Sequence, residues 1–208
     1  MKINLVNEAS FIEQNKEFIT ELGFEITKTG EPITLSCSDR KELVVIKKNN
    51  SHEIRFNQPV HIFRGLLLWK NLKEGETLKE VLQFSHMGPM VDLSRNAVLS
   101  ISGFKNFLKK QARLGLDRCM LYMEDTFEVR DYPYFGHFRG RYTAKELQEL
   151  DQYAQKLGIE LIPSIQTLGH LKNPMKWDFL NDLQDTEDIL LVGEEKTYTF
   201  IEALIKTT

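Results

Sequence analysis

The sequence predicts an α/β protein in which a small α+β domain, residues 1–86, precedes the first part of a TIM (β/α) barrel, residues 87–208. Three mainly apolar segments, at 90–96, 120–125 and 159–165, each end in polar residues, and amphipathic helical patterns separate them. This alternation is typical of a barrel whose chemistry lies at the carboxyl ends of its strands. Because a whole barrel usually needs at least about 200 residues, we expect roughly half a barrel, truncated before the fourth strand.

The composition excludes several classes of partner. The net charge is −3 and the 27 basic residues form no run, so we expect no nucleic-acid partner. No apolar stretch approaches the length of a membrane span, and the amino terminus lacks the apolar core of a signal peptide. We therefore expect a cytoplasmic protein without membrane association. Its two cysteines, Cys37 and Cys119, are predicted to be buried free thiols.

The first domain combines two predicted helices with several short strands. Ser10 and Glu13 have the spacing of a capping box for a first helix, which Gly23 ends. A second helix is predicted over 59–69, with Trp69 in the core. Strands are expected at 24–27, 33–36, 43–46 and 54–56, with hairpin-like turns at 39–41 and 49–51. The pattern indicates an antiparallel or mixed sheet, and His52 and His61 are interpreted as surface or packing residues.

Each helix of the second domain has its own start and stop signals. Ser100 or Ser102 can cap the helix that follows the first strand, and Gly115 ends it. Thr143 and Glu146 form a capping box for the next helix. The remaining predictions are a helix end at Gly158, strands at 118–123 and 159–165, a possible strand at 189–192 and a helix at 197–205.

Asp92 and Arg95 occur where the first barrel strand is predicted to end. On spacing alone, a local ion pair or helix cap is as good an interpretation as a functional one. In the functional interpretation, the rigid donors of the Arg95 guanidinium hold two neighbouring sugar hydroxyls while the Asp92 carboxylate orients it.

Glu124 and Asp125 are adjacent carboxylates at the end of the second barrel strand. Neighbours on a strand point to opposite faces, so only one of them is expected to enter the barrel mouth. The other carboxylate can fix the tautomer of a histidine from a neighbouring strand. His170, after the third strand, is either that histidine, paired with Asp125, or an ordinary loop residue.

A long loop, 126–142, is rich in aromatic and arginine side chains, among them Tyr134 and Arg139. Packing explains part of this composition, but long loops at this end of a barrel are usually functional. Aromatic faces beside arginines and carboxylates suit sugar binding. The sequence contains no phosphate-binding loop, HExxH or CxxC motif, and we therefore expect no cofactor and no metal.

These features resemble the family-20 glycoside hydrolases, the β-N-acetylhexosaminidases. The resemblance rests on the segments 88–96, 121–128, 133–142 and 162–170. The second and third look like the branch of the family thought to be intracellular in bacteria. Residues 1–85 look like the non-catalytic α/β domain that precedes the barrel there.

The resemblance implies a retaining, exo-acting enzyme for glycosides that end in N-acetylhexosamine. In that mechanism the acetamido oxygen of the substrate is the nucleophile, a glutamic acid protonates the leaving oxygen, and an adjacent aspartate orients the acetamido group. By motif, Arg95 would bind the terminal sugar with support from Asp92. Asp125 and His170 would form a relay behind the catalytic glutamate.

The sequence departs from the family at the catalytic pair, which the family carries at the end of the fourth strand. Glu124 and Asp125 belong to an earlier strand and have the reverse order. We therefore expect this chain alone to be inactive or nearly so. The alternative is a non-catalytic carbohydrate-binding or self-associating module on the same half-barrel. Either way, the open sheet edge predicts a homo-oligomer.

Overall fold

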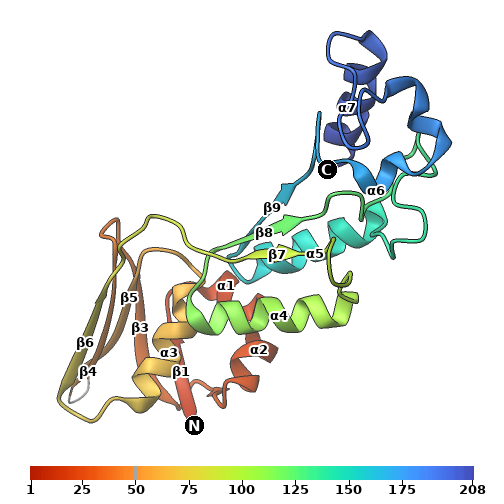
Figure 1. The fold of residues 1–208 in the computed structure, drawn as a ribbon. Helices are drawn as coiled ribbons and strands as arrows, with labels where there is room; N and C mark the ends of the chain where they lie inside the picture. The colour runs from red at the N-terminus through yellow and green to blue at the C-terminus, as the bar shows by residue number, and fades with distance from the viewer. Residues whose placement is uncertain (49–50) are drawn as a thin grey trace. The chain divides into compact units, whose positions relative to one another are not determined.

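A computed structural model describes residues 1–48 and 51–208, and the chain divides into two compact units (Figure 1). The first unit comprises 1–88, 105–119 and 152–160, and the second comprises 89–104, 120–151 and 161–208. Two segments of the predicted barrel thus belong to the first unit. The predicted domain limit at 86/87 stays a prediction.

The first unit contains a six-stranded mixed sheet with the order β2-β1-β3-β5-β4-β6. Its parallel pairs are β1 with β2, β1 with β3, and β3 with β5, whereas β4 is antiparallel to β5 and β6. The strands are β1 (Lys2–Val6), β2 (Glu25–Ile26), β3 (Glu31–Cys37), β4 (Glu42–Lys48), β5 (Ser51–Phe56) and β6 (Glu76–Val81).

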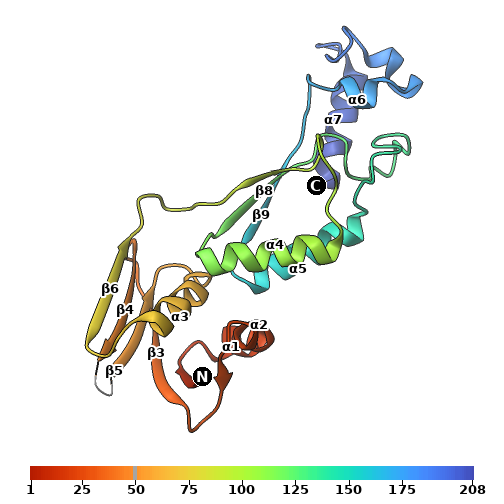
Figure 2. The same cartoon turned by 60° about the horizontal axis from the view of Figure 1, so that its bottom comes forward.

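Three helices accompany this sheet. They are α1 (Ala9–Gln14), α2 (Lys16–Glu21) and α3 (His61–Asn71), and α3 packs on β4 and β5 (Figure 2). Alternate side chains of the strands enter the core with the helices. Ile33, Ile54, Phe63 and Trp69 are fully buried there, which confirms the predicted core position of Trp69. Trp69 Nε1 donates a hydrogen bond to His52 Nδ1 at 3.2 Å, so His52 is a packing residue as predicted.

The first predicted helix is two helices, because Asn15, with φ −112° and ψ 13°, leaves the helical conformation between them. The Asn15 amide donates hydrogen bonds to the backbone oxygens of Phe11 and Lys156, at 2.9 and 2.8 Å. The predicted capping box is wrong. The helix already begins at Ala9, after Glu8 in a left-handed conformation, and no side chain makes its amino-terminal cap.

Two strands and one turn also differ from the sequence predictions. The predictions missed β1 and β6, and β6 is mostly polar because it lies at the sheet edge. The turn at 39–41 is not a hairpin, because β5 lies between β3 and β4. Part of the predicted turn at 49–51 lies outside the described residues. Cys119 is a buried free thiol as predicted, but Cys37 is exposed because it ends β3.

The second sheet has three strands in the order β7-β8-β9, namely β7 (Met90–Asp92), β8 (Arg118–Tyr122) and β9 (Glu160–Ser164). β7 and β8 run parallel, with Asp92 opposite Tyr122. The connecting helices are α4 (Ile101–Leu114) and α5 (Ala144–Lys156). This confirms the predicted α/β class with a parallel sheet; closure of these strands into a barrel stays a prediction.

The local signals for α4 and α5 are also confirmed. Ser100 Oγ accepts the backbone N–H of Gly103, which decides between the two predicted caps. Thr143 Oγ1 accepts the N–H of Glu146, and the Glu146 carboxylate accepts the N–H of Thr143, as a capping box requires. Gly115 and Gly158 follow the two helices with positive φ.

The last segment contains α6 (Lys172–Met175), a 3₁₀ helix (Asp178–Leu183) and α7 (Glu195–Thr207). The prediction of a strand at 189–192 is wrong, since Ile189 and Leu190 make only isolated bridges. Among residues 1–48 and 51–208, no helix is long and apolar enough to cross a membrane, and no group of three or more side chains is arranged to hold a metal ion.

Candidate active site

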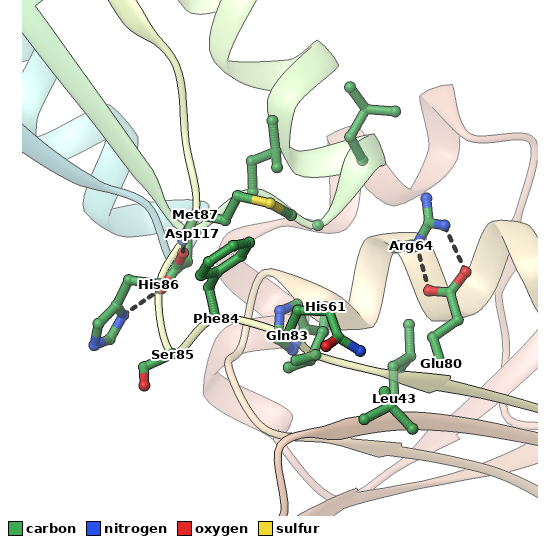
Figure 3. A pocket seen from close by; sticks show the side chains of 15 residues that line it. Leu43, His61, Arg64, Glu80, Gln83, Phe84, Ser85, His86, Met87 and Asp117 are labelled. Atoms are coloured by element: carbon green, nitrogen blue, oxygen red, sulfur yellow. Dashed lines mark hydrogen bonds and ion pairs between the residues drawn. The ribbon is translucent and has the colours of Figure 1, made fainter.

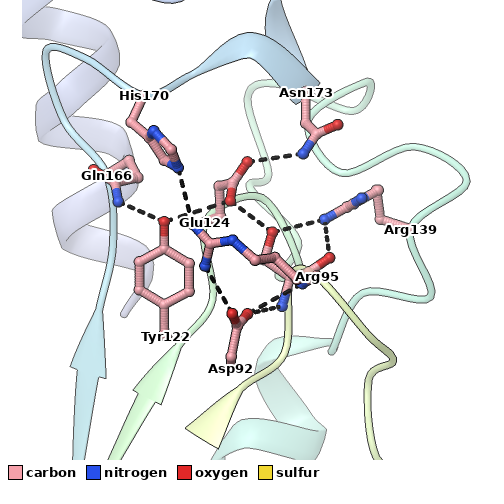
Figure 4. A network of polar contacts seen from close by, with 9 residues as sticks. Asp92, Arg95, Tyr122, Glu124, Arg139, Gln166, His170 and Asn173 are labelled. Carbon is pink, nitrogen blue, oxygen red and sulfur yellow. Dashed lines mark hydrogen bonds and ion pairs between the residues drawn. The ribbon is translucent and has the colours of Figure 1, made fainter. Parts of the chain in front are cut away.

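Polar side chains from three strand ends surround a cavity of about 380 Å³ in the second unit (Figure 4). They follow β7, β8 and β9, with one contribution from the loop after β8. Such clusters form because parallel strands bring their carboxyl ends to the same edge of a sheet. The lining residues are Ser94, Arg95, Glu124, Arg139, His170, Lys172 and Asn173.

Asp92 fixes Arg95 at the edge of this cavity. Asp92 Oδ1 accepts the backbone N–H groups of Ser94 and Arg95, at 2.9 and 3.1 Å, and Oδ2 accepts Arg95 Nη1 at 2.7 Å. The hydrogen bond from the Arg95 side chain is the main reason that the pKa of Asp92 is lowered. The predicted local ion pair between Asp92 and Arg95 is therefore confirmed. The pair also holds the guanidinium beside His170, with Arg95 Nη2 3.3 Å from His170 Nε2.

Glu124 is a buried carboxylate that contacts the segments following both neighbouring strands, Ser94 after β7 and Asn173 on α6. Its oxygens accept hydrogen bonds from Ser94 Oγ at 2.6 Å and from Asn173 Nδ2 at 2.8 Å. Its backbone has a positive φ of 52°, which is uncommon for a residue other than glycine. Glu124 is thus the carboxylate of the adjacent pair that lines the cavity.

Asp125 is completely buried and pairs with Arg139, not with His170. Arg139 Nε donates to Asp125 Oδ1 at 3.1 Å, and Arg139 Nη2 donates to the backbone oxygen and Oγ of Ser94, at 2.6 and 2.8 Å. Burial raises the pKa of Asp125, and the Arg139 charge opposes this rise. Among the residues that the structure describes, no hydrogen bond joins Asp125 to His170. Their relay stays a prediction.

The remaining predicted residue, Tyr134, does not line the cavity. Its ring is 55% exposed and lies near the rings of Phe179 and His137. The sequence predictions missed Ser94 and Asn173 as site residues. Ser94 directly follows a predicted strand end, which was a usable signal. Asn173 gave none, because a single amide on a short helix is usually a surface residue.

A larger cavity, of about 600 Å³, lies in the first unit, but fewer of its polar groups are free to bind a ligand (Figure 3). Its charged groups are already paired: His86 Nδ1 lies 2.6 Å from Asp117 Oδ2, and Arg64 donates two hydrogen bonds to Glu80. Phe84 contributes an exposed apolar ring. We therefore consider the smaller cavity the candidate site.

The sequence matches no protein-family model and no curated protein. The fold is nevertheless similar to solved β-N-acetylhexosaminidases of family 20. The exo-β-N-acetylglucosaminidase of Vibrio harveyi, in complex with N-acetylglucosamine, has a TM-score of 0.76 at 16% identity, over 99% of this chain and 40% of that chain. The Streptomyces plicatus N-acetyl-β-hexosaminidase has a TM-score of 0.78 at 16% identity, over 98% and 51%.

A third structure, the β-N-acetylhexosaminidase of Bacteroides fragilis, has a TM-score of 0.70 at 14% identity, over 99% and 49% of the two chains. This chain therefore has the α/β fold found in these glycoside hydrolases, and it spans between 40% and 51% of their lengths.

Proposed function

We propose that this chain is the amino-terminal portion of an exo-acting, retaining β-N-acetylhexosaminidase that works in the cytoplasm by substrate-assisted catalysis. The observation that carries the proposal is the cavity with Arg95 anchored by Asp92 at its edge. It occurs in a fold whose solved examples include one with N-acetylglucosamine bound.

The geometry suits recognition of a terminal sugar. The Arg95 side chain is 57% exposed, so its remaining N–H donors are accessible to hydroxyl oxygens. Asp92 keeps the planar guanidinium in one orientation, which reduces the entropy lost on binding. His170 and Asn173 add further polar groups to the same cavity. A monosaccharide with several hydroxyl groups requires such convergent donors and acceptors.

We also infer that these 208 residues alone do not hydrolyse the substrate. The sequence contains no Asp-Glu dipeptide. Of the adjacent carboxylates, Glu124 accepts hydrogen bonds from Ser94 and Asn173, and Asp125 accepts one from Arg139. Both carboxylates therefore already have protein partners, and they follow β8 rather than a fourth barrel strand. A missing general acid typically lowers the rate about 10²–10⁴-fold.

Hydrolysis of an aryl β-N-acetylglucosaminide tests the catalytic part of the proposal. We expect turnover by a version extended through the rest of the gene and none by the 208-residue chain. Turnover by the short chain would contradict the incomplete centre. Lack of turnover by both would contradict the assignment as a hexosaminidase.

Calorimetric titration with N-acetylglucosamine tests the binding part. We expect Arg95→Ala to weaken binding about tenfold or more, because it removes a charged hydrogen-bond donor. Arg130→Ala is the matched control, since Arg130 is an exposed arginine of the same unit that does not line the cavity. Equal affinity of the two variants would contradict the sugar-binding role of Arg95.

The alternative function is a non-catalytic carbohydrate-binding or self-associating module. The three-stranded sheet favours self-association, because β7 and β9 are its edge strands and the side chain of Met90 on β7 is 59% exposed. Sedimentation analysis tests the association that we expect with either function: we propose a homo-oligomer, and a monodisperse monomer at all concentrations would contradict it.

A further inference from the structure

The ring of Tyr122 lies against the guanidinium of Arg95 in the second unit (Figure 4). The central guanidinium carbon, Cζ, lies over the ring at 5.1 Å from the ring centroid. The face of an aromatic ring is electronegative and attracts a cation placed over it, and arginine is the cation most often found in this contact. Asp92 thus holds one edge of the guanidinium through Nη1, and Tyr122 supports its face.

The strand register brings Tyr122 to this position. β7 and β8 pair in parallel with Asp92 opposite Tyr122, so the two side chains lie on the same face of the sheet. Arg95 follows Asp92 by three residues, and the ion pair draws its side chain back over that face. The chain neighbours Leu121 and Met123 point to the opposite face and are buried, whereas Tyr122 is half-buried. Core packing therefore does not account for the Tyr122 ring.

The hydroxyl group of Tyr122 is held by Gln166, which follows β9. Gln166 Nε2 donates a hydrogen bond to the hydroxyl oxygen at 2.7 Å, and the hydroxyl group donates a longer one, of 3.5 Å, to Glu124 Oε2. A phenol that is bonded on both its acceptor and its donor side loses freedom to tilt. Contacts thus run from the end of β9 through Tyr122 to Arg95 and Asp92 at the end of β7.

We propose that Tyr122 and Gln166 are positioning residues for sugar binding: Gln166 holds the Tyr122 ring, and the ring holds the Arg95 guanidinium in the orientation that meets the terminal sugar. This inference rests on the proposed function. The Arg95 side chain is 57% exposed, so water competes with its ion pair to Asp92. A ring against the guanidinium limits its rotation before the sugar arrives, and less entropy is then lost on binding.

The proton–nitrogen correlation NMR signal of the Arg95 Nε–H group tests the ring contact without any sugar. A proton over the face of an aromatic ring is shielded by the ring current. We therefore expect Tyr122→Leu to move this signal to higher chemical shift, and Tyr122→Phe to retain most of the shielding. Arg95→Lys lacks the group and so identifies the signal. An unmoved signal in Tyr122→Leu would overturn the inference.

NMR titration of the 208-residue chain with N-acetylglucosamine, a method that also measures weak binding, tests the positioning role. We expect Tyr122→Leu to weaken binding roughly two- to tenfold, as loss of a partly exposed cation–ring contact implies. Tyr122→Phe and Gln166→Ala should each weaken binding about twofold, and the double variant no more than either alone, because both remove the same hydrogen bond. In an Arg95→Ala background, Tyr122→Leu should cause no further loss, because its effect depends on the guanidinium.

Tyr198→Leu is the matched control and should retain the affinity, because Tyr198 is an exposed tyrosine of the same unit that does not line the cavity. An unchanged affinity of Tyr122→Leu, or an equal loss with and without Arg95, would overturn the positioning role and leave the proposed function intact. If circular dichroism shows that Tyr122→Leu is unfolded, Tyr122→Phe and Gln166→Ala decide, and additive losses from these two would overturn the proposal. Failure of the unchanged chain to bind the sugar would overturn both the sugar-binding role of Arg95 and this inference.

Discussion

Arg139→Gln tests whether the buried charge of Asp125 depends on a single partner. Asp125 is completely buried, and its ion pair with Arg139 is the one such contact among its described interactions. Removal of one member of a buried pair typically costs about 3–5 kcal/mol of unfolding free energy. Arg139 is 20% exposed, so water partly replaces it, and we expect about 2–4 kcal/mol at pH 7.

The cost of Arg139→Gln depends on pH in a direction that the structure fixes. Burial raises the pKa of Asp125 above its unfolded value, so the stability that this group contributes is present at low pH and lost as pH rises through the folded pKa. Arg139 opposes the rise, and its removal raises the folded pKa of Asp125 further. The variant therefore loses more stability at pH 7 than near pH 4.5, because the protonated form of Asp125, which needs no counter-charge, is more populated at the lower pH.

Urea unfolding at the two pH values, followed by tryptophan emission and far-ultraviolet circular dichroism, measures this difference. In an Asp125→Asn background the pH dependence of the Arg139→Gln effect should disappear, since the titrating group is gone. Arg130→Gln, at an exposed site, should cost less than about 0.5 kcal/mol at either pH. An Arg139→Gln cost that is equal at both pH values, or larger in acid, would refute the reasoning.

Further substitutions test three local features of the fold by urea unfolding. Gly140→Ala should lower the free energy of unfolding by about 1–2 kcal/mol, because φ is +64° but the space around the new Cβ is open. Gly136→Ala, at a φ of +67°, should lower it by at least about 2 kcal/mol more, because its Cβ would clash with the backbone oxygen of Asp125. Equal costs for the two variants would contradict that clash. Thr143→Ala should cost about 1 kcal/mol through loss of the capping box, against less than about 0.5 for the neighbouring exposed Lys145→Ala. Phe200→Ala should cost about 3–5 kcal/mol, since its fully buried ring packs on Tyr132 and Phe135; a cost below about 1 kcal/mol would show that this core is loosely packed.

The alternation of segments in the second half was readable because its signals are local. The Thr143–Glu146 box and the glycines at 115 and 158 each depend on residues within one turn of a helix. In the first half, β6 was missed because an edge strand buries little and needs no apolar alternation. The turn at 39–41 was misread for a different reason. It joins two strands that are neighbours in the sequence but not in the sheet, and a local pattern does not show which strands pair.

The sequence by itself determined the α/β class, most element positions and the strand ends where polar residues collect, because periodicity and caps act over a few residues. Only the tertiary structure decided which of those residues meet. It paired Asp125 with Arg139 and His170 with Arg95, and it brought Ser94 and Asn173 to the two oxygens of Glu124. These contacts join residues 14 to 75 positions apart. Their formation depends on how the strands pair and where the loops close, which no short-range pattern specifies.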